Sequence, residues 1–518
     1  MRRLLALIVF LTMPAAQSYA ARAVAPGAEG IAWHAGNVDA AFAQAKRERK
    51  PVFLFWGAVW CPPCNQVKST IFNRQDFIER SRAFVPVYLD GDTPAAQKLG
   101  SRFKVSGYPT MILFRPDGTE VTRLPGEVDG DRYMEVLTLG INATRPVREL
   151  LAAVNSGKHV LGVSDWRLLA FYAWDVDEQS VVPKAQLPAT LVKVAQACPP
   201  SAGDAALRLQ LKALAINAKA TEKDRAALDK AAALAQVQRV LADEKLVREM
   251  YSVLTDSADD ITGYLTSGGT AERTQLLSTW DKVLVRLADE ASLSRADRLG
   301  ATAARVALAK LDQPKDAVLP TALAADARAA AVRADKETTN VYERQSVITF
   351  AGYVLREAGL LNESDTLLKA ELTRSHSPYY YMSGLAANAK RRGDVPAALD
   401  WYAKAYDGSK GPATRLQWGA SYVRALVELA PQDAAHIEQA AGRIIGELEA
   451  KPETFYARNG NVLSGLGRRL NEWGATNLQD ATLARLRTQM DGVCNKLPAA
   501  APERKTCAQV LVAKAAAG

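Results

Sequence analysis

Cysteine, histidine and aromatic residues are all scarce in this sequence. The 518 residues include five cysteines and four histidines, which argues against a small disulfide-built scaffold and against a histidine-rich metal site. Aromatic residues make up only 7% of the chain, while alanine, the strongest helix former, is abundant in the second half. No apolar run beyond the first 20 residues reaches the roughly 18 residues of a membrane span. The composition therefore predicts a globular, largely helical protein.

A strong excess of one charge is also missing. Lys and Arg number 65 and Asp and Glu number 56, which gives a formal net charge of +9. The longest basic cluster, residues 46–50, stands at the end of a predicted helix, where cations complement the helix dipole. We interpret this cluster as a helix end rather than as a nucleic-acid patch, and we predict no nucleic-acid partner.

The first 20 residues have the pattern of a secretory signal peptide. Two arginines precede an apolar stretch at residues 4–13, and Ser18 and Ala20 supply the small residues of a cleavage site. No cysteine follows that could carry a lipid anchor. The pattern predicts a soluble, exported protein that begins near Ala21, and the bacterial appearance of the signal favours the periplasm. An uncleaved N-terminal anchor is the alternative.

Residues 30–141 alternate between predicted strands and helices. The expected strands are 52–56, 84–89, 111–114 and 120–124, and the expected helices are 38–49, 62–72, 76–82, 93–103 and 131–141. The continuous apolar run at 52–56 is typical of a strand that is buried on both faces. The motif WCPPC, residues 60–64, stands at the junction between the first strand and the helix that follows it.

This order of elements, with a Cys-x-x-Cys at a strand-to-helix junction, resembles the thioredoxin fold. Trp60 before the first cysteine and the loop VSGYPT at residues 105–110 match further motifs of the thioredoxin-like superfamily. Residues 50–77 are most similar to the exported domains of periplasmic thiol-disulfide interchange proteins. The resemblance covers about a fifth of the chain, and it implies an α/β thioredoxin domain at residues 21–145, after the signal peptide at 1–20.

The resemblance implies that Cys61 and Cys64 are the catalytic residues and that no cofactor is needed beyond their redox-active disulfide. Cys61 would stand at a helix N-terminus, where unpaired N–H groups and the helix dipole favour the attacking thiolate. Cys64, one turn later, would resolve the mixed disulfide. A structural disulfide or half of a zinc site is the alternative interpretation, but a zinc site needs further ligands that the sequence does not supply. No metal is predicted.

Trp60, Tyr108 and Pro109 are the candidate substrate-binding residues. The resemblance implies a cis bond before Pro109, which would present a backbone edge to an extended substrate segment. Trp60 could instead be an ordinary core residue. For Tyr108, a role in substrate selection and a role in packing are equally supported by the sequence. A thioredoxin-like copper chaperone is a third interpretation. Such a protein would normally have a histidine downstream near the loop, and residues 65–145 contain none.

One position departs from the family pattern. Strongly reducing thioredoxins carry a buried Asp six residues before the first cysteine, and this sequence has Phe55 there. Help in deprotonating Cys64 must come from elsewhere or be absent. The direction of electron flow, reductase or oxidase or isomerase, is therefore left open.

Beyond Pro146 the pattern is helical throughout. We expect an all-α region at 146–340 and a tetratricopeptide-like helical region with a C-terminal hairpin at 341–518. Short Gly, Pro and Asp turns separate the predicted helices, and no phosphate loop or nucleophile–base motif occurs among them.

A spacing of 34 residues supports the repeat. It separates Gly359 from Gly393 and Pro378 from Pro412, although the signature tryptophan is missing from both copies. Three consecutive tyrosines, 379–381, open a helix of this region. They could line a peptide-binding groove, but packing against the previous repeat is the preferred interpretation.

The remaining cysteines lie in the helical part. Cys494 and Cys507 flank a Pro-containing loop, and in an oxidising compartment we expect them to form a structural disulfide. Cys198 is then the odd cysteine and is expected to be buried and inert.

Two functions from different classes fit the whole chain. The first is an exported thiol-disulfide oxidoreductase whose partners are protein substrates and an upstream thiol reductant or oxidant, with a helical domain that recruits them. The second is an interaction scaffold in which the helical repeats do the work and the thioredoxin-like domain is a redox-sensitive accessory.

Overall fold

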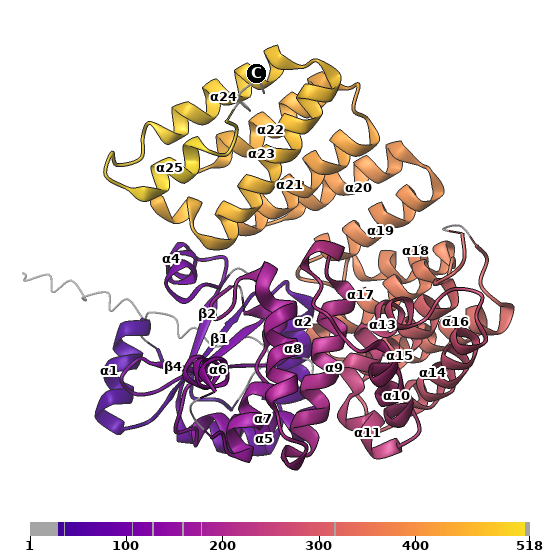
Figure 1. Ribbon diagram of the computed structural model, residues 1–518. Coiled ribbons are helices and arrows are strands. Elements are labelled where there is room, and N and C mark those ends of the chain that lie inside the picture. The colour runs from indigo at the N-terminus through magenta and orange to yellow at the C-terminus, as the bar shows by residue number, and fades with distance from the viewer. Residues whose placement is uncertain are drawn as a thin grey trace, which may run out of the picture.

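The computed structural model describes residues 30–512 except 36, 106, 127–128, 158–159, 178 and 315–316. The predicted signal peptide and the predicted mature N-terminus at Ala21 lie outside the described residues. A small sheet with its helices comes first, and helices alone follow it (Figure 1). The expected fold class, an α/β thioredoxin-type unit followed by a large all-α region, is confirmed.

Four strands form one mixed sheet in the order β2-β1-β3-β4. β1 runs parallel to β2 and antiparallel to β3, and β3 runs antiparallel to β4. Every residue of β1 is buried, as its uninterrupted apolar sequence predicts. The bounds of the strands are β1 Val52–Gly57, β2 Val85–Asp90, β3 Thr110–Phe114 and β4 Glu120–Leu124.

Helices cover both faces of the sheet because side chains alternate along each strand. α1 and α4 pack against the face that contains Leu54 and Trp56 of β1. α2, α3 and α5 pack against the opposite face, which contains Phe53 and Phe55. These helices are α1 Val38–Glu48, α2 Pro62–Val67, α3 Gln75–Arg80, α4 Pro94–Phe103 and α5 Gly130–Ile141.

The predicted helix 62–72 is divided in two. Its first part is α2, and the second part, Lys68–Phe72, is a π-helical turn. A π turn shifts the faces of a helix relative to a regular α-helix. Lys68, Ile71 and Phe72 are all buried in this turn.

All strands among the described residues lie before residue 125, and the rest of the chain is helical. No helix in the described part is long and apolar enough to cross a membrane. The bounds are α6 Val147–Ser156, α7 Val163–Ala170, α8 Leu187–Ala197, α9 Asp204–Lys219, α10 Lys230–Leu241, α11 Glu244–Glu249, α12 Tyr251–Asp256, α13 Ala258–Leu265, α14 Ala271–Asp289, α15 Arg295–Lys310, α16 Thr321–Glu337, α17 Val341–Glu357, α18 Leu361–Glu371, α19 Tyr379–Arg392, α20 Val395–Gly408, α21 Pro412–Leu429, α22 Ala434–Glu447, α23 Ala457–Asn477, α24 Asp480–Cys494 and α25 Pro502–Ala508.

The two glycines spaced by 34 residues lie at helix ends, whereas the two prolines with the same spacing, Pro378 and Pro412, lie at the starts of α19 and α21. Gly359 follows α17 and Gly393 caps α19, and both adopt the left-handed conformation that glycine tolerates best. A Cβ atom on Gly352 would lie 2.7 Å from Leu368 of α18, so this small residue allows α17 and α18 to pack closely. Helices from α17 to α22 then follow one another as packed neighbours.

The helical region folds back over the sheet unit on two sides (Figure 1). α20 to α25, coloured orange to yellow, lie above the sheet, with α23 packed against α4, and α17 lies next to α2. One continuous hydrophobic cluster runs from the α2 side of the sheet through α6–α9 and on to α21–α24. The sequence pattern therefore changes near residue 146, but the hydrophobic core continues across this point without a break.

Candidate active site

The two cysteines of the CPPC motif lie at the start of α2. They form a disulfide with a Cα–Cα distance of 5.2 Å. Cys61 is the N-cap of α2, and its Sγ accepts a hydrogen bond of 3.2 Å from the backbone N–H of Cys64. Pro62 and Pro63 occupy the first turn, where N–H groups have no intrahelical partner and their loss costs nothing. The free N–H groups and the positive end of the helix therefore favour a thiolate at Cys61.

The second loop of the site comes from the start of β3. The peptide bond between Tyr108 and Pro109 is cis, as the resemblance implied. Tyr108 and Pro109 line a cavity of about 370 Å³ together with Pro63 of α2. The loop before β3 and the first turn of α2 therefore line the same cavity.

Trp60 is held from both units of the molecule. Its Nε1 donates a hydrogen bond of 2.6 Å to Oδ2 of Asp92, which follows β2, and its ring lies edge-on to Tyr108 at 6.1 Å. Thr414 of α21 donates a hydrogen bond to the other oxygen of Asp92. Burial raises the pKa of Asp92, and the hydrogen bonds from Thr414 and Trp60 oppose that rise.

Side chains of the helical region cover the exposed face of Trp60. Tyr380 of α19 stacks on Trp60 with ring centroids 5.9 Å apart, and Trp418 of α21 packs edge-on against Tyr380 at 5.0 Å. The guanidinium of Arg458, from α23, lies 5.4 Å from the ring of Trp60 and 4.9 Å from the ring of Tyr108.

As a result the reactive pair is shielded. Cys61 is 3% exposed and Cys64 is fully buried, and Trp60 is only 4% exposed. The surroundings of this buried pair are built in part by the helical region, through its contacts with Trp60.

Sequence reasoning missed Asp92, Thr414, Tyr380, Trp418 and Arg458. Of these residues only Tyr380 was marked by a sequence pattern, the run of three tyrosines at 379–381. The tyrosines of this run have different roles in the structure. Tyr381 is buried against α17, in the first copy of the expected repeat, and donates to the backbone oxygen of Arg344, which fits the preferred interpretation. Tyr380, one residue earlier, instead contacts the active-site tryptophan.

The cavity beside Pro109 is lined by the helical region as well. Its walls contain Tyr251, Asp256 and Phe350 from α12 and α17. A neighbouring hollow of about 360 Å³ shares Asp175, Ser252 and Asp256 with it.

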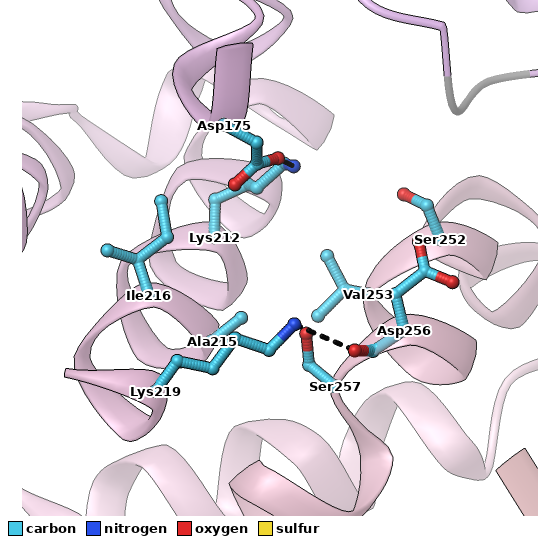
Figure 2. A pocket seen from close by; sticks show the side chains of 9 residues that line it. All are labelled: Asp175, Lys212, Ala215, Ile216, Lys219, Ser252, Val253, Asp256 and Ser257. Carbon is cyan, nitrogen blue, oxygen red and sulfur yellow. Dashed lines mark hydrogen bonds and ion pairs between the residues drawn. The ribbon is translucent and has the colours of Figure 1, made fainter. Parts of the chain in front are cut away.

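Charged side chains line this second hollow (Figure 2). Lys212 and Lys219 of α9 stand on one side and Asp256 on the other. Lys212 forms an ion pair of 2.5 Å with Asp175, and Lys219 donates to the backbone oxygen of Asp256 at 2.8 Å. The first cavity has residues of both the sheet unit and the helical region in its walls, whereas the second hollow is lined by the helical region alone.

The position of the missing buried Asp is apolar. Phe55 is fully buried and packs edge-on against Phe72 at 4.8 Å and face-on against Tyr88 at 5.7 Å. It leaves no carboxylate beneath the disulfide on β1.

The other three cysteines lie in the helical region. Cys494 at the end of α24 and Cys507 in α25 are disulfide-bonded, with a Cα–Cα distance of 5.6 Å. Cys198 is a buried free thiol, and burial raises its pKa to about 11. A thiol with so high a pKa is a poor nucleophile at neutral pH.

Comparisons with known proteins agree with this geometry for the sheet unit. Residues 38–140 match the family model described as thioredoxin-like domain. A thioredoxin of Mycobacterium bovis is 35% identical over 89 residues, which are 17% of this chain and 72% of the thioredoxin.

Longer proteins match over the same part. The thiol:disulfide interchange protein DsbD of Pseudomonas fluorescens is 33% identical over 104 residues, 19% of this chain, and the match spans only 17% of that relative. A solved structure named DsbH oxidoreductase aligns with 21% of this chain and 83% of its own, at 21% identity and a TM-score of 0.20.

Proposed function

The chain belongs to the thioredoxin-like family through residues 38–140, and from this premise we propose that it is an exported thiol-disulfide oxidoreductase acting on protein clients. The observation that carries the proposal is the position of Cys61 at the N-terminus of α2, one turn before Cys64 and beside cis-Pro109.

The chemistry proceeds in two exchanges. The Cys61 thiolate attacks a client disulfide, so that one client sulfur becomes bonded to Cys61 and the other leaves as a thiolate. The Cys64 thiolate then attacks Sγ of Cys61, forms the Cys61–Cys64 disulfide and releases the second client sulfur. The client gains two electrons and the protein loses two, and the reverse sequence would insert a disulfide into a client.

The helical region is proposed to recruit the client. Tyr380 and Arg458 contact Trp60, the neighbour of Cys61, and the cavity next to Pro109 has walls from both units. Trp60, Tyr108 and Pro109 would contact the cysteine-bearing segment, and the tetratricopeptide-like helices from 341 onward would bind flanking parts of the client. Residues 1–20 are proposed to direct export to the periplasm, where exchange partners with disulfides occur.

The experiment is a disulfide-exchange assay with purified full-length protein. Reduction of insulin by the pre-reduced protein should be lost in Cys61→Ala and in Cys64→Ala, because each step needs one of the two thiols. Cys198→Ala is the matched control and should retain activity, since this thiol is buried and burial raises its pKa to about 11. Retained exchange in Cys61→Ala would refute the proposal.

A second function is favoured by the burial of the reactive pair. Because Cys61 is only 3% exposed, the thioredoxin-like unit could be a redox-sensitive part of an interaction scaffold. In that case client binding would survive Cys61→Ala, and no covalent adduct with clients would form.

A further inference from the structure

A lysine is buried at the C-terminal end of the active-site helix. Lys68 follows α2, and its backbone N–H donates to the carbonyl oxygen of Cys64, which places the two residues one turn apart on the same face. The Lys68 side chain is 1% exposed, and both Cys64 and Phe55 belong to the same buried cluster on this side of the sheet.

Aromatic rings surround the amine. Nζ of Lys68 lies 6.0 Å from the centroid of Phe55 and 5.6 Å from the centroid of Tyr88. Trp33 packs against both of these rings and closes the cluster. The Lys68 amine therefore lies beside Phe55, and position 55 is the one at which the family pattern has a buried Asp.

The amine has no hydrogen-bond partner among the described residues, and neither has the hydroxyl of Tyr88. Two titratable groups of β2 act on or lie near the amine, Asp90 through its charge and Tyr88 through its ring, and Cys64 stands one turn earlier on the same helix face. No described carboxylate lies within 4 Å of Nζ, and Asp90 acts on it only through its charge.

Such an arrangement lowers the stability of the fold. An unpaired buried amine loses its hydration without compensation, and an apolar side chain of similar size would fill the same space at lower free energy. Burial lowers the pKa of Lys68 to about 8, against a smaller opposing effect of Asp90. An appreciable fraction of the amine is therefore neutral near neutral pH and able to accept a proton.

We propose that Lys68 is the proton acceptor for the thiol of Cys64 in the resolving step. The Cys64 thiol gives its proton to the neutral amine and becomes a thiolate, and Lys68 becomes an ammonium. The Cys64 thiolate then attacks Sγ of Cys61, the bond between Cys61 and the client sulfur breaks, and the client leaves as a thiolate. The ammonium afterwards returns its proton to solvent or to the leaving sulfur.

This inference rests on the proposed exchange function, and a two-phase assay separates the two. Reduced protein, with Cys198→Ala in every sample, is mixed with 5,5′-dithiobis(2-nitrobenzoate). Attack by Cys61 releases the first thionitrobenzoate, and resolution by Cys64 releases the second in a step that does not depend on reagent concentration. Absence of the second phase in the parent protein would refute the exchange pair itself.

Lys68→Met is the decisive variant, because methionine fills the aromatic space without a proton acceptor. The second phase should slow on the order of 10²-fold near pH 7, and its pH midpoint should rise, while the first phase stays within about twofold. Lys46→Met, on the exposed surface of α1, is the matched control and should change neither phase.

Two further measurements keep the proposal open to refutation. Lys68→Gln should show the same slow second phase, so that the result does not depend on one variant folding well. Lys68→Met should unfold at a higher temperature than the parent, because it removes an unpaired buried amine. A folded Lys68→Met protein with an unchanged second-phase rate and pH midpoint would overturn the assignment.

Discussion

Tyr380 of α19 stacks on Trp60, the residue before the nucleophile, with an angle of 24° between the ring planes. This contact joins the two units of the molecule at the point where disulfide exchange would take place. Arg458 contacts the same tryptophan from α23, so two helices of the C-terminal part pack against the residue next to Cys61.

Removal of this contact should expose the reactive cysteine. In Tyr380→Ala the ring that covers Trp60 is lost, together with about 0.5–1.5 kcal/mol of aromatic packing. The rate at which reduced Cys61 reacts with a bulky charged maleimide should rise severalfold. Tyr353→Ala is the control, because Tyr353 lies exposed on α17, and it should leave the rate unchanged. Equal rates in Tyr380→Ala and wild type would mean that the stack does not limit access.

Clients should accumulate as mixed disulfides when the resolving cysteine is removed. In Cys64→Ala the first exchange survives and the second is lost, so exported proteins should remain bonded to Cys61. Non-reducing gels of periplasmic extracts would reveal these adducts, and they should vanish in the Cys61→Ala, Cys64→Ala double variant. Extracts without adducts would favour the interaction-scaffold function.

Local features of the site could be predicted from the sequence. An apolar run followed by WCPPC predicts a buried strand and a helix whose N-cap is Cys61, because these depend on neighbouring residues. The cis bond before Pro109 followed from the family resemblance. The long-range contacts could not be predicted, since periodicity tells which face of α19 or α23 is buried but not which partner it meets.

Lys68 shows the same limit in another way. A helix over 62–72 places residue 68 one turn after Cys64, so the sequence predicts that the two side chains lie on the same face of the helix. Its burial was not, because lysines are rarely buried and nothing local marks this one as an exception. The π turn that begins at Lys68 and the aromatic rings of β1 and β2 decide its environment.

The C-terminal hairpin should depend on its disulfide. Closing the loop between Cys494 and Cys507 is worth about 3 kcal/mol in the chain-entropy model, so Cys494→Ala with Cys507→Ala should unfold at a lower urea concentration. Peptide mass spectrometry without reductant should find the two cysteines linked in exported protein. Linkage of Cys198 to either one, or two free thiols, would contradict the prediction.

The stability of the fold should rise with alkaline pH because of Lys68. Its pKa is about 8 in the folded protein and 10.5 when unperturbed, so between these values the unfolded chain binds more protons than the folded one. The free energy of unfolding therefore increases as pH rises through this window, and the cost of the buried ammonium is fully present only below about pH 8. From near pH 7 to near pH 9.5 the gain from this group is about 2 kcal/mol.

Urea unfolding of wild type and Lys68→Met at these two pH values isolates the contribution, because every other titrating group is common to both proteins. Lys68→Met should be the more stable protein near pH 7, and its advantage should shrink by about 2 kcal/mol near pH 9.5. A difference that stays constant with pH would show that Lys68 keeps its proton throughout this range. In that case it could not accept the proton of Cys64, and the thiol would have to be deprotonated by solvent.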